Sequence, residues 1–368
     1  MTGDQVPTVG VEEEYQLVDP ASRELRSSGR LVLAEARRTL GEEVQPELYA
    51  SQIEIGTPIC STLDEVGREL RRLRAAVATA AGRTGTRIAA AGTHPFSDWR
   101  DQRLSPKERY HNLVADHRRL AGEEVVFGCH VHVGVPDREA AVAVLNRVRP
   151  WLAPLVALGA NSPYWLGEDT GFASWRTELW RRWPLAGTPG PFADRAAYDA
   201  LVEQLVATGG VREPTKLYFD VRPSERYDTV EFRVADVQAD VDTAVLLAGL
   251  CRALAVTALA EEASGAPLDE VRPELLLAAK FRAARSGLDG ELIDLPGRRA
   301  APAAEVVEAL VEHVRPALEA AGDEAVVGEL AARVLADGTG AARQRAAMVR
   351  AGRIEGVVDD LIERTLAV

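Results

Sequence analysis

The sequence carries a set of residues that can bind metal ions and anions, and they recur at alternate positions of short segments. The set consists of Glu12, Glu14, Glu54, His130, His132, Glu231 and Arg233. Carboxylate and imidazole groups bind divalent cations, and a set rich in carboxylates favours Mg²⁺ or Mn²⁺ over zinc. An arginine beside such a set can stabilise developing negative charge. These residue types therefore indicate metal-assisted chemistry on an anionic substrate, provided that the fold brings them together.

The elements expected to position these residues are strands, because apolar and polar side chains alternate through the segments that contain them. We predict strands over residues 8–18, 49–57, 87–93, 125–135, 216–222 and 230–234. In each segment that carries candidate residues, one face is apolar and the other is polar; His130 and His132, for example, alternate with Val131 and Val133. Glu13 departs from the pattern, since it falls on the apolar face of its strand.

A solvated sheet face is the simpler interpretation of this alternation. Such a face usually carries scattered Lys, Ser, Thr and Arg. This one concentrates carboxylates and histidines, and like charges on adjacent strands repel one another unless a cation neutralises them. Gly10, Gly128 and Gly134 fall on the same face, where a ligand could approach the backbone closely. We therefore interpret the face as a binding site.

The basic residues Lys216, Arg222 and Arg233 fall on the polar face of the last two predicted strands. A nucleoside triphosphate fits this combination, because metal ions neutralise its oxygens while arginine stabilises the phosphoryl group during transfer. The sequence contains no GxxxxGK[ST] phosphate loop, no kinase-type HRD with DFG and no convincing GxGxxG after a strand. If the protein uses ATP, we expect it to do so on an antiparallel sheet.

The predicted fold class is α+β, with a mainly antiparallel sheet and helices packed on one face. Clear alternation is unlike the continuous apolar runs of a buried parallel sheet, and the turn at residues 223–228 is too short for a parallel crossover. Helices are predicted from residue 63, over residues 136–159 with breaks near Pro150 and Pro154, and from residue 242 onwards, with a long loop over 161–195. We expect a single domain over 1–368, in which residues 1–240 contain the sheet and residues 241–368 are helical.

The composition excludes several classes of protein. The chain has 368 residues and a formal net charge of −13, so non-specific binding to nucleic acid is not expected. The most apolar stretch, residues 244–260, is interrupted by Arg252, and the N-terminus lacks the features of a secretory signal. Cys60, Cys129 and Cys251 have no paired spacing and are interpreted as reduced thiols. These features predict a cytoplasmic protein without a membrane or nucleic-acid partner.

Several longer stretches resemble the bacterial type 2 glutamate–cysteine ligase family, also described as carboxylate–amine ligases, within the glutamine synthetase-like superfamily. The matching stretches are GVEEEYQLVDP (10–20), QIEIGTP (52–58), AAGTHPF (90–96), GCHVHVGV (128–135), NSPYW (161–165), SWRTELWRRWPLAGTPGPF (174–192) and TVEFRVADVQ (229–238). They cover most of residues 8–240. The resemblance implies a curved antiparallel sheet whose concave face holds ATP and Mg²⁺ or Mn²⁺.

The resemblance also implies a role for each candidate residue. The metal ligands implied are Glu12, Glu14, Glu54, His130 and Glu231. The resemblance implies that His132 and Arg233 bind ATP or phosphate, and the position of Lys216 and Arg222 on the same polar face makes them further expected phosphate-binding residues. Arg233 would steady the transferring phosphoryl group, with Glu231 beside it as a catalytic partner. Arg176 lies in a predicted loop, where it either binds the substrate carboxylate or anchors the loop.

The activity implied is an ATP-dependent ligation, in which an amino-acid carboxylate such as that of glutamate is phosphorylated and an amine then attacks the acyl phosphate. The expected partners are small-molecule carboxylates and amines, and a homodimer is one assembly to consider. Two alternatives remain open at this stage. One is a metal-dependent hydrolase built on His130 and His132, although no obvious third histidine accompanies them. The other is a non-catalytic, nucleotide-binding descendant of the ligases.

Overall fold

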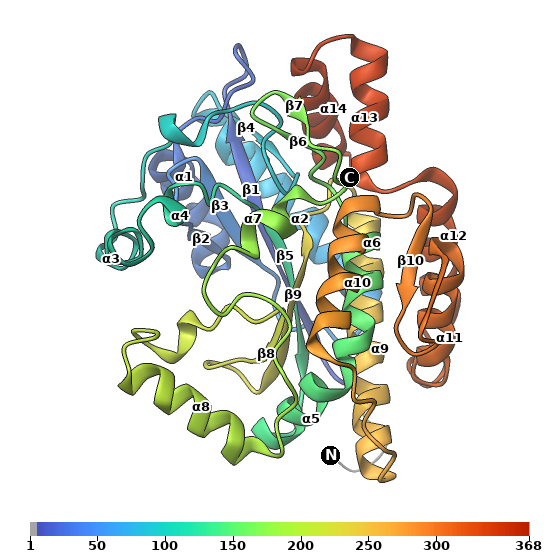
Figure 1. Ribbon diagram of the computed structural model, residues 1–368. Helices are drawn as coiled ribbons and strands as arrows, with labels where there is room; N and C mark the ends of the chain where they lie inside the picture. The colour runs from blue at the N-terminus through green and yellow to red at the C-terminus, as the bar shows by residue number, and fades with distance from the viewer. Residues whose placement is uncertain (1–5, 368) are drawn as a thin grey trace.

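A sheet of seven antiparallel strands forms the centre of the computed structural model, which describes residues 6–367 (Figure 1). The strand order is β2-β3-β1-β5-β9-β8, and β4 pairs with β1 beside this path. The strands are β1 (Val9–Val18), β2 (Val44–Pro46), β3 (Gln52–Gly56), β4 (Arg87–Ala89), β5 (Gly128–Gly134), β8 (Val221–Pro223) and β9 (Thr229–Asp236). The predicted α+β class with a mainly antiparallel sheet is thereby confirmed.

The register of the sheet places the candidate ligands opposite one another on a single face. Glu14 pairs with Glu54 across β1 and β3, and Glu12 pairs with His130 across β1 and β5. His132 in turn pairs with Glu231 of β9. Side chains opposite each other on adjacent antiparallel strands share a face. The candidate residues that the alternation assigned to the polar face therefore lie on one face of the four strands β3, β1, β5 and β9.

A β-bulge between β5 and β9 changes this parity at one end of the sheet. Val131 pairs with Phe232, but Cys129 pairs with Ala235, so β9 carries one extra residue at this point. Beyond the bulge, Asp236 pairs with Gly128 and shares its face. Simple alternation along β9 would have assigned Asp236 to the apolar face.

The strand predicted over residues 216–222 is wrong for most of its length. Residues Pro214–Lys216 form a 3₁₀ turn, and only β8 pairs with β9. The cause is local: the Arg222 guanidinium donates hydrogen bonds to the carbonyl oxygens of Thr215 and Leu217, which are therefore not available to a strand ladder.

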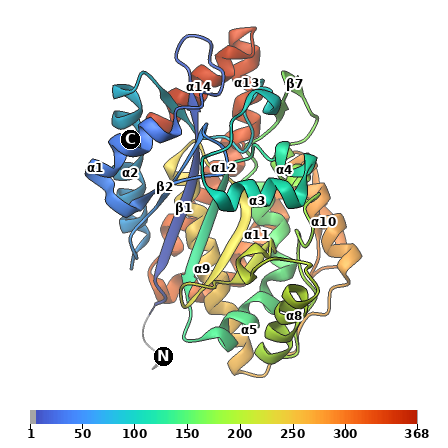
Figure 2. The ribbon, with the colours of Figure 1, turned by 90° about the vertical axis from the view of Figure 1, so that its left-hand side faces the viewer.

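The apolar face of the sheet packs against a layer of helices. In Figure 1, β1, β5 and β9 stand between α3 and α8 on one side and α9, α11 and α12 on the other, and Figure 2 shows α9 behind β1 and β5. The helices of the first part are α1 (Gly29–Leu40), α2 (Leu63–Arg83), α3 (Glu108–His117), α4 (Arg119–Gly122), α5 (Arg138–Val148), α6 (Leu152–Leu158), α7 (Trp175–Trp180) and α8 (Arg195–Ala207). As predicted, the helical stretch over 136–159 is interrupted near Pro150, by a 3₁₀ turn at Arg149–Trp151.

Two helical stretches are apolar enough to resemble membrane spans. Residues 138–158 and α9 (Val241–Ala263) meet this criterion by length and composition, and 78% of each tested window is buried inside the protein. Both stretches are therefore part of the hydrophobic core. For example, α9 packs on α2, on α5 and on the strands β1 and β5.

Glu13, which broke the apolar face in the sequence, has a partner in the helix layer. Arg74 of α2 donates two hydrogen bonds to its carboxylate, from Nε at 2.9 Å and from Nη2 at 2.5 Å, and both side chains are fully buried. The same guanidinium also donates to the carbonyl oxygens of Gln238 and Ala239, just before α9. The pair therefore joins β1, α2 and the segment that leads into α9.

The C-terminal part contains α10 (Pro273–Ser286), α11 (Ala303–Ala321), α12 (Glu324–Asp337), α13 (Gly340–Ala351) and α14 (Glu355–Leu366). It also contains a small hairpin of β10 (Glu291–Asp294) and β11 (Arg299–Pro302), where the sequence predicted only a break between helices. A second two-stranded ribbon, β6 (Tyr164–Trp165) and β7 (Glu168–Asp169), lies in the long loop. One hydrophobic core runs from the strands into α9, α11 and α12, so we propose that the chain is a single domain.

Candidate active site

A cavity of about 1560 Å³ lies over the polar face of the sheet. Every residue singled out from the sequence lines it: Glu12, Glu14, Glu54, His130, His132, Arg176, Lys216, Arg222, Glu231 and Arg233. The strands thus bring together residues that are more than two hundred positions apart. Lys216 reaches the cavity from the 3₁₀ turn rather than from a strand, with its ammonium group 3.7 Å from Glu213.

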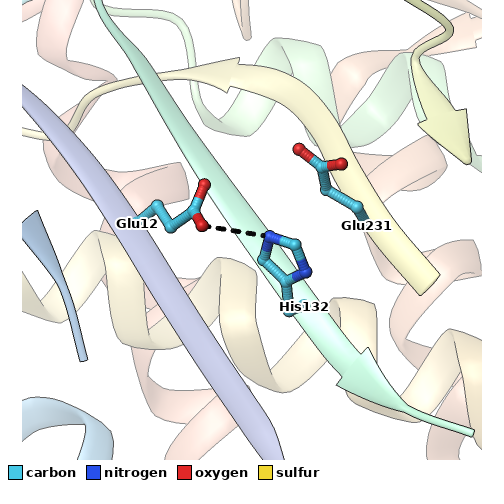
Figure 3. A group of neighbouring side chains, drawn as sticks. All are labelled: Glu12, His132 and Glu231. Atoms are coloured by element: carbon cyan, nitrogen blue, oxygen red, sulfur yellow. Dashed lines mark ion pairs between the residues drawn. The ribbon is translucent and has the colours of Figure 1, made fainter. Parts of the chain in front are cut away.

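Glu12, His132 and Glu231 form a compact group on three adjacent strands, and their side chains point toward one another (Figure 3). One potential ligand atom of each residue lies within 4.8 Å of the others. The distance from His132 Nε2 to Glu12 Oε1 is 3.4 Å, and His132 Nδ1 is 3.0 Å from the hydroxyl of Thr229. His130 approaches from the same strand, with Nδ1 3.4 Å from Glu12 and 3.8 Å from Glu231.

This donor set fits a divalent cation. His132 Nε2 is buried and has no hydrogen-bond partner, although two carboxylates lie beside it. Burial by itself would raise the pKa of Glu12, but the close approach of His130 and His132 outweighs it and holds that pKa well below its usual range. Burial would lower the pKa of His132, yet Glu12 raises it above its ordinary value. The Glu12 carboxylate and the unpaired Nε2 of His132 are groups that Mg²⁺ or Mn²⁺ would bind here.

Two arginines bracket Glu231. Arg222 Nε donates to Glu231 Oε2 at 2.7 Å, and Arg233 donates to the other carboxylate oxygen. Burial would raise the pKa of Glu231, but the charges of Arg233 and Arg222 hold it well below its usual range. Arg222 Nη1 donates to two backbone carbonyls, so the guanidinium is held in place and orients Glu231. Arg233 keeps Nε buried without a partner and is the better placed of the two to meet an anion.

A second acidic group lies beside the first and includes a residue that sequence reasoning missed. The residue is Glu47, whose charge is a cause of the raised pKa of both Glu54 and Glu14. Burial, followed by Glu47, raises the pKa of Glu14 to about 8, and burial, Glu12 and Glu47 raise that of Glu54 well above its usual range. Carboxylates crowded in this way would share a cation. Glu47 lies between β2 and β3, where no alternation marks it.

Arg176 enters the cavity from α7 and is held there by the bulged end of β9. Its backbone N–H donates to Ser162 Oγ, Ser162 and Ser174 donate to the Asp236 carboxylate, and Arg176 Nη1 lies 3.9 Å from the same carboxylate. A Cβ on Gly128 would lie 2.5 Å from Arg176 Nη2. The space at this glycine, predicted to admit a ligand, is therefore occupied by the guanidinium.

The antiparallel sheet brings carboxylates, histidines and arginines to one face, an arrangement that could hold a divalent cation and a phosphate group. The model of the glutamate–cysteine ligase family 2 matches residues 8–362, so the chain belongs to that family. It is 42% identical over 367 residues to a protein of Rhodopirellula baltica named provisionally as a glutamate–cysteine ligase 2, with 98% of both chains covered. It is 44% identical over 380 residues to a protein of Frankia alni with a similar name, covering 99% of this chain and 98% of the other. The family resemblance seen in the motifs is thus confirmed.

Solved structures show the same fold at low sequence identity. A glutamate–cysteine ligase of Francisella tularensis in complex with AMP superposes with a TM-score of 0.75 at 13% identity, over 99% of this chain and 90% of that one. A bifunctional glutathione synthetase of Pasteurella multocida superposes with a TM-score of 0.71 at 16% identity, over 98% of this chain and 52% of that one. The glutamine synthetase-like architecture expected from the resemblance is confirmed.

Proposed function

We propose that the protein is an ATP- and Mg²⁺-dependent carboxylate–amine ligase that activates the carboxylate of an amino acid such as glutamate. The observation that carries the proposal is the convergence of the metal-binding group Glu12, His132 and Glu231 with Arg233 in one cavity. Family membership supports the reaction class. Of the six histidines, only His130 and His132 line the cavity, which favours a ligase over a hydrolase with a histidine-rich metal site.

The two ends of the cavity differ in a way that suggests the direction of the nucleotide. At one end, where Gly134 pairs with Thr229, the exposed side chains of Tyr227 (63% exposed) and Ile59 (81% exposed) line the rim. At the other end, Arg176 is buried. We place the nucleobase at the open rim and the acid at the closed end, because an acyl phosphate must be kept from water. The triphosphate would then lie along the strands between them.

In this reaction the residues of the cavity would have separate roles. A divalent cation held by Glu12, His132 and Glu231 would neutralise phosphate oxygens and make the γ-phosphorus more electrophilic. Arg233, held by Glu231, would place its free Nε–H against the transferring phosphoryl group. The acid's carboxylate oxygen attacks the γ-phosphorus, ADP leaves, and the amine then displaces phosphate from the acyl carbon. Three buried free thiols are consistent with the cytoplasmic location that we propose.

Hydroxylamine trapping tests the proposal directly. Purified protein, ATP and Mg²⁺ are incubated with hydroxylamine and a panel of acids, beginning with glutamate. We expect a hydroxamate, with ADP and phosphate as the other products, because the metal group and Arg233 favour transfer of the γ-phosphoryl group. Formation of AMP and pyrophosphate, or no hydroxamate with any acid despite ATP binding, would contradict the proposal.

A further inference from the structure

A buried acidic side chain and a buried basic side chain at the closed end of the cavity each have a polar atom without a hydrogen-bond partner. Glu124, in the segment between α4 and β5, is 4% exposed; its Oε2 accepts a hydrogen bond from Trp183 Nε1, but its Oε1 has no partner. Arg176 is 3% exposed, and its Nε has no partner. Both residues line the cavity. Buried polar atoms are rarely left unpaired, so each position calls for a ligand group.

Glu124 and Arg176 face the same space without neutralising each other. Among the described residues no ion pair joins Glu124 to any basic group, and Arg176 pairs with Asp236, at 3.9 Å. The two side chains are connected through α7: Trp183, which donates to Glu124, stacks on Trp180, and Trp180 is one turn from Arg176 on that helix. Burial raises the pKa of Glu124 to about 7, against the hydrogen bond from Trp183 and the charges of Arg182 and Arg176. A ligand that carries one negative and one positive group would satisfy both residues at once.

We propose that Glu124 and Arg176 together bind the α-amino acid portion of the acid substrate, with the α-ammonium group on Glu124 and the α-carboxylate on Arg176. The inference rests on the proposed function, which places the acid at this end, and it names the substrate class: free α-amino acids whose side chain carries the carboxylate to be activated. Glu124 was not a candidate from the sequence, because it precedes the alternating segment of β5.

The walls beside Glu124 suit an ammonium group. Trp180, Trp183 and Tyr218 form an aromatic cluster that lines the cavity, with the Tyr218 ring centroid 5.2 Å from each indole. Aromatic faces attract cations, and they exclude water that would compete for the carboxylate. An aliphatic amine or an amino acid meets both conditions, whereas a neutral N-acylated group would leave the Glu124 oxygen unpaired.

The test compares wild type and a Glu124 variant on two substrates, one with and one without the α-amino group. Glu124→Gln keeps the shape of the side chain and an oxygen to accept from Trp183, but it removes the charge. Its matched control is Glu178→Gln on α7: Glu178 is also buried and also has an unpaired Oε1, but it does not line the cavity. Hydroxamate formation is measured with the amino acid that reacts best and with its deaminated analogue, for example glutamate and glutarate.

We expect Glu124→Gln to lower kcat/KM for the amino acid about 10- to 100-fold, mainly through KM, and to leave the value for the deaminated analogue within about 2-fold. Glu178→Gln should change neither. An equal loss on both substrates, or no loss on either, would overturn the inference. So would a variant that loses amide formation with an amine but keeps full hydroxamate formation, because Glu124 would then hold the incoming amine. A wild-type protein that forms no hydroxamate at all refutes the proposed function instead.

Discussion

Removing the Glu14 carboxylate is expected to stabilise the metal-free protein while weakening its response to Mg²⁺. Glu14 lies beside Glu54 and near Glu47, and burial followed by the charge of Glu47 raises its pKa to about 8. A carboxyl group in an ordinary unfolded chain has a pKa of 4.5. Glu14→Gln removes the ionisable group and keeps an oxygen that can accept from the N–H of Gly128, which lies 2.6 Å from the carboxylate.

The sign of the pH dependence follows from this shift. Between pH 4.5 and about 8 the folded protein keeps a proton on Glu14 that the unfolded chain has lost, so the free energy of unfolding falls as the pH rises through that range. At pH 7 the interval above 4.5 is about 2.5 pH units, and at about 1.4 kcal/mol per unit this gives ~3.5 kcal/mol. Partial solvent access reduces the figure, and we expect the variant to gain about 2–3 kcal/mol at pH 7.

Urea unfolding of EDTA-treated protein at pH 5.5, 7 and 8, with and without Mg²⁺, measures both effects. Mg²⁺ should stabilise the wild type most at pH 8, because it binds the deprotonated carboxylates, and it should stabilise Glu14→Gln less at every pH. Glu203→Gln, an exposed position on α8, is the control. The reasoning is refuted if metal-free Glu14→Gln is less stable than the wild type, or if both proteins respond equally to Mg²⁺.

Three further predictions concern other groups. Arg74→Met should lower the free energy of unfolding by about 3–5 kcal/mol in urea titrations, because it leaves the Glu13 carboxylate buried without a counter-charge; adding Glu13→Gln should recover part of the loss. Arg233→Lys should slow hydroxamate formation more than 10-fold in kcat while changing the KM for ATP little, because lysine lacks the planar guanidinium. Burial lowers the pKa of His94 to about 3, so stability should decline as the pH falls from about 6.5, and a pH series of unfolding curves for His94→Gln should show a smaller decline.

Alternation along the strands was sufficient to predict which candidate residues share a face. His130 and His132, and Glu12 and Glu14, lie where a period of two places them, because hydrogen-bond register in an antiparallel sheet preserves that period across strands. The same reasoning fails where the period is interrupted. The bulge in β9 moves Asp236 onto the face of the sheet that carries the candidate ligands. No residue type at that point of the sequence indicates that the strand contains an extra residue.

Residues outside strands could not be found in this way. Glu47 and Glu124 lie in connecting segments, and they reach the cavity only because tertiary packing folds those segments over the sheet. Glu13 illustrates the opposite case: its position on the apolar face was read correctly, but its partner Arg74 is 61 residues away in α2. Charge pairing at such separations has no local signal in a single sequence.

The helical C-terminal part contributes to the site through buried ion pairs. Lys280 of α10 pairs with Asp220, which also accepts a hydrogen bond from Thr188 at 2.8 Å. Asp220 lies just before β8, in the segment that carries the cavity residues Lys216 and Tyr218. Because that segment has little strand pairing of its own, α10 supplies the anchor that the sheet does not.

A second anchor acts on the opposite side of the sheet. Arg252 of α9 donates to Ser61, the residue before the N-cap of α2, and pairs with Asp323 at the start of α12. Since α2 carries Arg74, which holds Glu13 between the candidate ligands on β1, contacts of Arg252 and Arg74 connect α12 to that strand through α2. This arrangement gives a structural reason for the family match to continue beyond the last strand of the sheet.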